Sequence, residues 1–496
     1  MRSLCLTLTL LLQLSGALAQ AWPGDAQTKI SVRYLAVPLF TRTNGNACIE
    51  IRVFVAAHTR VPLQQVELLL NKEAVSSIAQ VEMPAPDENS LQPLLSARVV
   101  GKSGSIAART VVPLSVSLQQ GWNNLWVNVQ LKEEANLDAR PGLQVIAIQT
   151  EQGKQWKPAA GERPALFRTG MVLRQKGEDH VHTYRIPGIA ITGKGTLLAV
   201  YDARYHNSGD LPGNIDVAMS RSTDGGRRWE PMRIIMDMGE PQENNGVGDP
   251  AILFDPVQAK IWVAALWSKG NRSIAGSQPG LSPDTTGQFV LTSSDDEGKT
   301  WTAPHSITPQ VKNPAWHLYF NGPGNGIAMR NGTLVFPSQY WDETTEPAKV
   351  GMPHSSIVYS RDHGKTWQSG VGAKSNTTES QVVETGPGEL MLNMRDNRGG
   401  FRSMATTRDM GKTWTEHASS RQLLPDPVCM AGFSSATVEV QGHKKQVLLF
   451  SNPAFPLERS HITIRASTDA GESWPAGPPL LVDERTCYGY SALIAI

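Results

Sequence analysis

The 496-residue sequence has little cysteine, little charge and no excess of either sign. Its four cysteines are too few to form the framework of a disulfide-rich secreted domain. Charged residues make up 18%, and 46 Lys and Arg balance 45 Asp and Glu, so the chain lacks the basic excess that binds nucleic acid. The 40% hydrophobic content excludes intrinsic disorder. We therefore expect a folded protein with two or three domains.

Signatures of bound metals and cofactors are also absent from the sequence. It contains no His-Glu-x-x-His zinc signature. The glycine-rich segment 322–326 has no strand–helix–strand context, so dinucleotide binding is dismissed. No stretch after the first 20 residues is apolar enough to cross a membrane. We expect neither a metal nor an organic cofactor, and no transmembrane segment.

Residues 1–19 have the features of a secretory signal peptide. A short positive start is followed by an apolar run over residues 4–14 and by the small residues Ala17 and Ala19. The apolar run is too short to span a bilayer, which takes about 20 residues. We expect cleavage near Ala19 and a secreted or periplasmic protein. The three remaining cysteines can then form at most one pair, and free buried thiols are the simpler expectation.

Residues 20–155 contain short segments in which polar and apolar residues alternate. Such segments lie at 50–55, 66–70, 125–129 and 143–148, and no long amphipathic helix accompanies them. The pattern predicts a small antiparallel β-sandwich, for which carbohydrate binding is a candidate role. A segment rich in Lys, Gly, Pro and Ala at 152–163 is expected to be a linker.

Residues 165–496 contain five copies of the pattern Ser-x-Asp-x-Gly-x-Thr-Trp, with small variations. The copies begin at Ser222, Ser294, Ser360, Thr407 and Ser467, and each ends on one of the 13 tryptophans. The aspartates of successive copies are 72, 66, 47 and 60 residues apart, a spacing typical of four-stranded propeller blades. The Asp and Ser/Thr side chains can bond turn N–H groups, Gly supplies a positive φ, and Trp packs on the adjoining strands. We therefore interpret the repeats as structural turns and exclude their aspartates from the candidate catalytic acids.

Several further short motifs follow the same order along the chain as in the sialidase (neuraminidase) superfamily. They are Tyr184-Arg185-Ile186-Pro187, Asp202-Ala203-Arg204, Gly248-Asp249-Pro250, Asn321-Gly322-Pro323-Gly324, Glu379-Ser380-Gln381, Asn393-Met394-Arg395 and Tyr490-Ser491. With the five repeats, known as Asp boxes, they make residues 167–496 resemble a secreted bacterial exo-sialidase. The resemblance implies an all-β fold in which a six-bladed β-propeller follows a small β-sandwich domain. It also implies exo-α-sialidase activity on glycoproteins, gangliosides and oligosaccharides.

The substrate that the resemblance implies explains why arginines are expected in the site. Sialic acid carries a carboxylate on its anomeric carbon, and the family binds this carboxylate with three converging arginines. The arginine fork pairs bidentately with a carboxylate and keeps its charge. Arg185 and Arg395 match the first two positions. Arg459 matches the third, with Arg465 as a rival.

The same carboxylate would repel a carboxylate nucleophile, and sialidases use tyrosine instead. A phenol has a pKa near 10 and needs an adjacent base. The resemblance assigns the nucleophile to Tyr490, with Tyr488 as the alternative. It assigns the base to Glu379, with Glu384 as the competitor.

The resemblance places the acid/base catalyst at Asp210, on a loop rich in Gly and Pro between two predicted strands. Asp216, at the start of the second strand, is the rival. Arg204 and Asp249 match residues that bind the 4-hydroxyl side of the sugar in the family. The implied mechanism is hydrolysis with retained configuration through a covalent sialyl-tyrosine.

Two other functions share parts of this pattern. A trans-sialidase, intermolecular or intramolecular, would keep every catalytic residue. A non-catalytic glycan-binding Asp-box propeller would have lost the arginines or the tyrosine, and neither is lost here. The family usually continues after the tyrosine with strands that carry a further Glu, so we also expect a truncated C-terminus with an open last blade.

Overall fold

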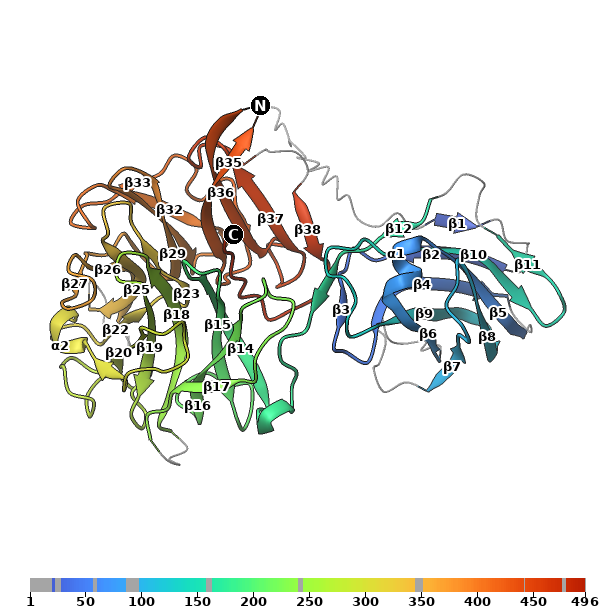
Figure 1. Cartoon of the computed structure of the whole chain (residues 1–496), viewed down its shortest axis with the longest axis horizontal. Coiled ribbons are helices and arrows are strands. Elements are labelled where there is room, and N and C mark those ends of the chain that lie inside the picture. Colours follow the sequence, from blue (N-terminus) through green and yellow to red (C-terminus); the bar gives the residue numbers. More distant parts are fainter. Residues whose placement is uncertain are drawn as a thin grey trace, which may run out of the picture. The chain divides into compact units, whose positions relative to one another are not determined.

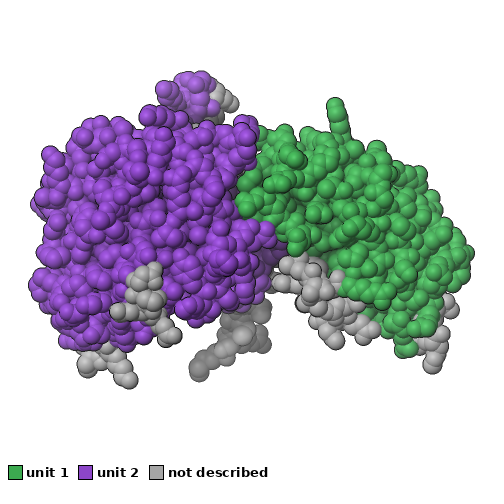
Figure 2. Space-filling model, turned by 60° about the horizontal axis from the view of Figure 1, so that its bottom comes forward, with its two compact units in different colours: residues 1–172 green, residues 173–496 purple. Residues whose placement is uncertain are grey.

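The computed structural model describes residues 20–22, 28–56, 60–85, 98–157, 163–239, 244–343, 351–440, 442–474 and 479–495. The chain divides into two compact units, residues 1–172 and 173–496 (Figure 2). The predicted signal peptide lies outside the described residues, so export stays a prediction. Within the described ranges, no helix is long and apolar enough to span a membrane.

The N-terminal unit is an antiparallel sheet of eleven strands with one apolar core. Alternate residues of the paired strands face this core, as Ile51 and its partner Leu125 do, and both are fully buried. All four segments predicted as strands lie in strands. The strands are β1 (Gln20–Trp22), β2 (Thr28–Tyr34), β4 (Asn46–Val55), β5 (Val61–Leu70), β6 (Ile78–Pro84), β7 (Val99–Lys102), β8 (Arg109–Leu118), β9 (Gly121–Leu131), β10 (Gly142–Thr150), β11 (Gln155–Trp156) and β12 (Ala165–Leu166). The short helix α1 (Lys72–Ser77) begins at Asn71, whose Oδ1 accepts from the N–H of Ala74 at 2.7 Å.

The boundary between the units lies later in the chain than the predicted linker. β12 pairs with β10, and β13 (Thr169–Met171) pairs in parallel with β3 (Leu39–Thr41). Residues 165–171 therefore belong to the N-terminal unit, and the boundary is at residue 172 rather than at 155–165. Backbone pairing with strands more than 20 residues away decides this, and the composition of the linker does not reveal it.

The second unit is a β-propeller, in which the blade sheets follow one another around a common centre from green to red (Figure 1). The described residues form five blade sheets. The first two are β14 (Thr183–Ile191), β15 (Leu197–Arg204), β16 (Ile215–Ser222), β17 (Arg233–Met236), and then β18 (Gly246–Asp255), β19 (Lys260–Ser268), β20 (Gln288–Ser294), β21 (His305–Ser306) with β23 (Gly324–Asn325). The third is β22 (Leu318–Asn321), β24 (Ile327–Ala328), β25 (Leu334–Asp342), β26 (Met352–Ser360), β27 (Gln368–Ser369) and β28 (Lys374–Ser375).

The fourth and fifth blades complete the described part of the propeller. They are β29 (Thr377–Gly386), β30 (Glu389–Asp396), β32 (Ser403–Thr407), β33 (Thr415–Glu416), and β35 (Gly432–Val440), β36 (His443–Pro453), β37 (Ile462–Ser467), β38 (Leu480–Asp483). β31 (Gly400–Phe401) pairs with β34 (Pro425–Asp426) in a small separate sheet, and α2 (Thr308–Val311) and a 3₁₀ turn (Glu178–His180) complete the elements. The all-β fold, a propeller after an N-terminal β domain, is confirmed. Six blades were expected, and the described residues form five blade sheets.

Inner strands of neighbouring blades approach closely where the sequence has glycine. A Cβ on Gly188 of β14 would lie 2.3 Å from the carbonyl oxygen of Gly324, so only glycine fits there. Asn325 beside it accepts from the N–H of Ile189 at 3.0 Å and donates to the carbonyl of Leu493 at 2.8 Å. Part of the glycine-rich segment 322–326 is thus explained by packing at the centre of the propeller.

All five Asp boxes form the same turn, as predicted. In each, the Ser or Thr hydroxyl donates to the Asp carboxylate and accepts from the Gly N–H, and the carboxylate accepts from the N–H four residues on. The five glycines have φ between 75° and 90°. Hydrogen bonds from Ser467 and Ser473 lower the pKa of Asp469 to about 2. These aspartates are therefore used in turn formation.

We expect Asp296→Ala to lower the free energy of unfolding by about 1–2 kcal/mol, because it leaves several turn donors without their acceptor. Asp296 accepts from Ser294 at 2.8 Å, from the N–H of Lys299 at 2.9 Å, and from both the N–H and the hydroxyl of Thr300 at 2.9 and 2.6 Å. Urea unfolding followed by tryptophan fluorescence measures the change.

The neighbouring Asp295 offers a matched control for this variant. Its side chain is 67% exposed and pairs with Lys260 at 3.1 Å. An exposed ion pair contributes at most about 1 kcal/mol, so Asp295→Ala should shift the unfolding midpoint less. Equal losses for the two variants would contradict the assignment of the Asp box as the stabilising element.

Candidate active site

The predicted site residues gather at one end of the blade sheets. Arg185, Asp249 and Glu379 lie near the start of the inner strands β14, β18 and β29. Arg204 and Arg395 lie at the end of the second strands β15 and β30. Antiparallel pairing places the start of a first strand beside the end of the second, as in the pairs Thr183–Arg204 and Thr377–Asp396. The propeller topology therefore brings residues that are far apart in sequence to one end.

Each of the three inner strands is irregular at its site residue. The register of pairing shifts between Arg185 and Gly188 in β14, between Gly248 and Ala251 in β18, and between Thr377 and Ser380 in β29. A bulge of this kind bends a strand and changes the direction of a side chain. Three equivalent bulges thus accompany Arg185, Asp249 and Glu379.

Tyr490, Glu379 and Arg395 form one hydrogen-bonded group. The hydroxyl of Tyr490 donates to Oε1 of Glu379, and Nη1 of Arg395 donates to Oε2 of Glu379 at 2.6 Å and to the Tyr490 oxygen at 3.2 Å. Burial and the charge of Glu379 raise the pKa of Tyr490 well above 10, although Arg395 opposes this. The phenol is therefore protonated at neutral pH and has a carboxylate in position to take its proton.

Two more arginines flank the same phenol ring. The Cζ atoms of Arg185 and Arg459 lie 5.1 and 5.8 Å from the ring centroid of Tyr490. Arg459 is held by backbone carbonyls, since Nη1 donates to Tyr488 and Nη2 donates to Val428, both at 3.0 Å. Three guanidinium groups thus contact one tyrosine side chain, Arg395 at its hydroxyl and the other two at its ring, an arrangement that suits an anionic ligand.

The rival residues lie elsewhere or have other partners. Glu384 caps two turns by accepting from the N–H groups of Arg330 and Gly388. Tyr488 is 60% exposed, and among the described residues its ring contacts Arg185 but not Glu379. Among those same residues, Arg465 in β37 has no hydrogen bond with another site residue. Asp216 accepts from the hydroxyl of Tyr205.

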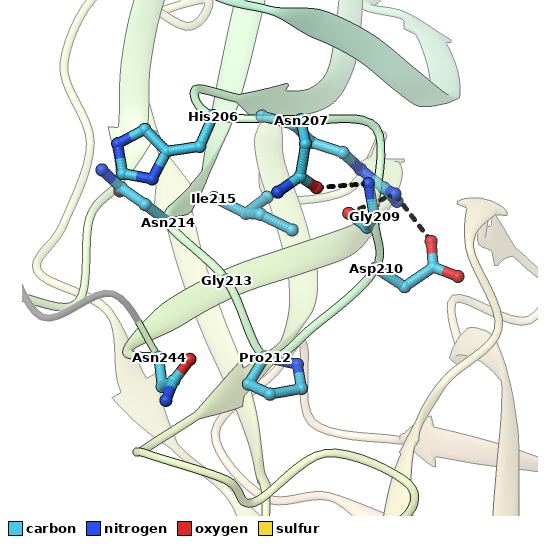
Figure 3. Close-up of a pocket in the computed structure, with 10 residues that line it drawn as sticks. His206, Asn207, Gly209, Asp210, Pro212, Gly213, Asn214, Ile215 and Asn244 are labelled. Carbon is cyan, nitrogen blue, oxygen red and sulfur yellow. Dashed lines mark hydrogen bonds and ion pairs between the residues drawn. The ribbon is translucent and has the colours of Figure 1, made fainter.

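Asp210 lies on the loop 205–214 between β15 and β16, and its side chain is 77% exposed. Its Oδ1 accepts from Nη1 of Arg204 at 2.6 Å and from Nη1 of Arg185 at 3.3 Å. Figure 3 shows the carboxylate directed out of the loop toward the dashed contact with Arg204. Asp210 therefore lies beside the arginine cluster and is open to solvent.

Asp202, which orients two of the predicted residues, was not predicted as a site residue. Its side chain is 1% exposed, and Oδ2 accepts from Nε and Nη2 of Arg204 at 3.1 and 2.8 Å. Its Oδ1 accepts from the N–H of Asp249 at 2.9 Å. Asp249 has a positive φ of 56°. Burial raises the pKa of Asp202, although Arg204 opposes this. The sequence could have indicated this role, because residues two apart in a strand, such as Asp202 and Arg204, face the same side.

Asp249, from the neighbouring blade, lies close to the carboxylate of Asp202. Burial and then the charges of Asp202 and Glu379 raise its pKa well above the ordinary value. Its carbonyl accepts from Nδ2 of Asn321 at 2.6 Å, which gives that motif residue a positioning role. No group of three or more His, Cys, Asp or Glu side chains in the described ranges could hold a metal ion.

The segment that carries Tyr490 is fixed by its small neighbours. Ser491 donates to the carbonyl of Ser451 at 2.8 Å and accepts from the N–H of Gly432 at 3.2 Å. Both Gly489 and Tyr490 have positive φ, 75° and 62°. A Cβ on Gly489 would lie 2.2 Å from Sγ of the buried, unpaired Cys429. Neither this contact nor the role of Cys429 was predicted.

We expect Gly489→Ala to destabilise the fold by about 2–4 kcal/mol, since overpacking and a positive φ both oppose alanine. The lowered midpoint of thermal or urea unfolding measures this. Adding Cys429→Ala should recover the overpacking part of the loss, because it removes the clashing sulfur.

Gly388→Ala is the matched control for the backbone effect alone. Gly388 has φ 72°, and no atom lies within 4 Å of a Cβ built there. We expect it to cost only about 1 kcal/mol. If Gly489→Ala and Gly388→Ala were equally stable, the contact with Cys429 would not constrain the Tyr490 segment.

Comparisons with known proteins agree with this geometry. Residues 195–496 match the BNR repeat-like domain, and residues 27–154 match the N-terminal domain of BNR-repeat neuraminidase. A sialidase of Bacteroides fragilis is 45% identical over 383 residues, which are 76% of this chain and 69% of that protein. A sialidase of Micromonospora viridifaciens is 33% identical over 332 residues, 65% of this chain and 50% of that protein.

A solved structure extends the similarity to nearly the whole chain. The Hadza microbial sialidase Hz136 superposes with a TM-score of 0.84 at 38% identity, over 93% of this chain and 94% of that one. The range 195–496 that matches the BNR repeat-like domain contains all five Asp boxes, together with Arg395, Arg459 and Tyr490. The chain therefore belongs to the sialidase (neuraminidase) family of glycoside hydrolases.

Proposed function

We propose that the chain is a retaining exo-α-sialidase that releases terminal sialic acid from glycoproteins, gangliosides and oligosaccharides through a covalent sialyl-tyrosine. One observation carries the proposal. The hydroxyl of Tyr490 donates to Glu379 and accepts from Arg395, while Arg185 and Arg459 lie against the phenol ring. A general base, a phenol and three fixed cations are what a substrate with a carboxylate at its reacting carbon requires.

In the first step, the three arginines hold the carboxylate of sialic acid. Glu379 removes the phenolic proton as the oxygen of Tyr490 bonds to C2 of the sugar. Asp210 gives a proton to the glycosidic oxygen as the bond from C2 to that oxygen breaks, and the leaving sugar departs as an alcohol. The raised pKa of Tyr490 supports the need for Glu379, because the phenol does not ionise unaided at neutral pH.

In the second step, water attacks C2 of the sialyl-tyrosine. Asp210, now a carboxylate, takes a proton from this water, and Tyr490 leaves and regains its proton from Glu379. Two displacements at C2 return the original configuration. The exposure of Asp210 supports this role, because the water and the leaving group must both reach it.

Arg204 and Asp249 have supporting roles in this scheme. Arg204 donates to Asp210 and is itself held by Asp202, so it positions the acid. Asp249 lies near enough to Glu379 for the two charges to interact, and we assign it to the 4-hydroxyl side of the sugar together with Arg204. Carbohydrate binding by the N-terminal unit stays a prediction.

Product analysis tests the proposed function. With 2,3-, 2,6- and 2,8-linked sialosides, we expect free sialic acid to appear first as the α-anomer in proton NMR spectra. Release of the β-anomer first would exclude retention. An anhydro-sialic acid or a new sialoside as the main product would show that a transferase replaces the hydrolase.

A substitution tests the nucleophile. Tyr490→Phe removes the attacking oxygen and should lower kcat/KM by about 10³-fold or more. Steady-state rates on an aryl sialoside measure the loss. Tyr488→Phe is the matched control two residues away and should change the rate by only a few-fold. If Tyr488→Phe abolishes hydrolysis while Tyr490→Phe retains it, the assignment of the nucleophile is wrong.

A further inference from the structure

Arg185 is held less firmly by hydrogen bonds than the other two arginines at Tyr490. Its one hydrogen bond in the described part of the chain runs from Nη1 to Oδ1 of Asp210 at 3.3 Å, and its Nε is buried without a hydrogen-bond partner. Arg395 instead donates to a carboxylate at 2.6 Å, and Arg459 donates to two backbone carbonyls at 3.0 Å. The orientation of the Arg185 guanidinium is therefore the least determined by hydrogen bonds.

The acceptor of that one hydrogen bond is shared and open to solvent. Oδ1 of Asp210 also accepts from Nη1 of Arg204, at the shorter distance of 2.6 Å, and the Asp210 side chain is 77% exposed. An ion pair with an exposed partner contributes little, because water screens it. The buried Asp202 attracts Arg185 electrostatically, although no hydrogen bond joins these two residues among those described. Arg185 therefore needs a further contact to hold it in position.

Two tyrosine rings supply this contact. Cζ of Arg185 lies 5.1 Å from the ring centroid of Tyr488 and 5.1 Å from that of Tyr490. A guanidinium within about 6 Å of an aromatic centroid is attracted by the electron-rich face of the ring. The attraction is stronger when the cation is shielded from water, and the Arg185 side chain is only 11% exposed. The two rings therefore hold the guanidinium where hydrogen bonds do not.

The backbone at Tyr488 is fixed, although its side chain lies at the surface. The carbonyl of Tyr488 accepts from Nη1 of Arg459 at 3.0 Å, and Gly489 and Tyr490 continue the chain with φ of 75° and 62°. The residue is 60% exposed, and its hydroxyl has no hydrogen bond with any residue that the structure describes. The contact that its side chain does make is the one between its ring and Arg185.

The proposed mechanism distinguishes the Tyr488 ring from the other contacts of Arg185. Asp210 gains and loses a proton during the reaction, and Tyr490 carries the sialyl group in the intermediate. These two contacts therefore change during each turnover. The ring of Tyr488 forms and breaks no bond, so it can hold Arg185 in the same way at every step.

We propose that Tyr488 is a positioning residue, whose ring holds Arg185 in the orientation that binds the carboxylate of sialic acid. The inference rests on the proposed function, which places this carboxylate on Arg185. The face of the ring, and not the hydroxyl, has this role. Phenylalanine should therefore replace Tyr488, and an aliphatic side chain should not.

The test measures binding of the carboxylate without turnover. An unsaturated analogue, 2,3-didehydro-2-deoxysialic acid, keeps the carboxylate but has no leaving group, and it is titrated into the full chain by calorimetry. We expect Tyr488→Leu to raise its dissociation constant about tenfold, and Tyr488→Phe to change it by about twofold or less, because phenylalanine keeps the ring face. The KM for an aryl sialoside should rise by a similar factor in Tyr488→Leu, while kcat falls less.

Trp122→Leu is the matched control, because it removes an exposed ring beside an arginine in the N-terminal unit. Trp122 is 45% exposed, and Cζ of Arg52 lies 4.8 Å from its ring centroid. This variant should bind the analogue as tightly as the wild type does. Arg185→Met removes the guanidinium, so in that background Tyr488→Leu should cause no further loss.

Three results would overturn the proposal. The first is wild-type affinity in Tyr488→Leu, and the second is an equal loss in Tyr488→Phe, which would assign the role to the hydroxyl. The third is an undiminished loss from Tyr488→Leu in the Arg185→Met background, because Tyr488 would then act without Arg185. A wild-type chain that binds the analogue but hydrolyses no sialoside refutes the proposed function alone, and the titrations then decide the role of Tyr488 separately.

Discussion

Three guanidinium groups lie around one phenol, and their mutual repulsion is the constraint that the surrounding structure has to satisfy. Like charges that gather around one side chain repel each other more strongly where water is excluded. Arg395 is bonded to Glu379, Arg185 pairs with Asp210, and Arg459 donates to two backbone carbonyls. Each cation thus has its own acceptor, so the cluster is held in place before any ligand arrives.

The residues that stabilise the blades and the residues of the candidate site lie in different parts of each blade. The Asp boxes connect the third strand of each blade to the outermost strand, and all five have the same hydrogen bonds. Five of the site residues are instead at the starts of inner strands or at the ends of second strands: Arg185, Asp249 and Glu379, and Arg204 and Arg395. In the inner strands β14, β18 and β29, the register of pairing shifts beside Arg185, Asp249 and Glu379 respectively.

Local chemistry explains which features could be predicted from the sequence. An Asp box completes its bonds within eight residues, so its pattern alone predicted the turn and hence the propeller. The resemblance also identified Tyr490 and Glu379, which proved to be bonded. The contact of Cys429 with Gly489 joins positions 60 residues apart and leaves no sequence pattern. The unit boundary at residue 172 and the blade number depend in the same way on long-range strand pairing.

The different exposures of the two proton carriers fit the mechanism proposed above. The proton of Tyr490 moves to Glu379 and later returns, so this exchange needs no solvent and can occur among buried side chains. The proton of Asp210 leaves with the glycan and is replaced from water, so this carboxyl must be open to both. The partly buried Tyr490–Glu379 pair and the 77% exposed Asp210 meet these opposite requirements. The loop 205–214 can therefore vary around the acid without disturbing the nucleophile, since no residue of that loop bonds to either member of the pair within the described ranges.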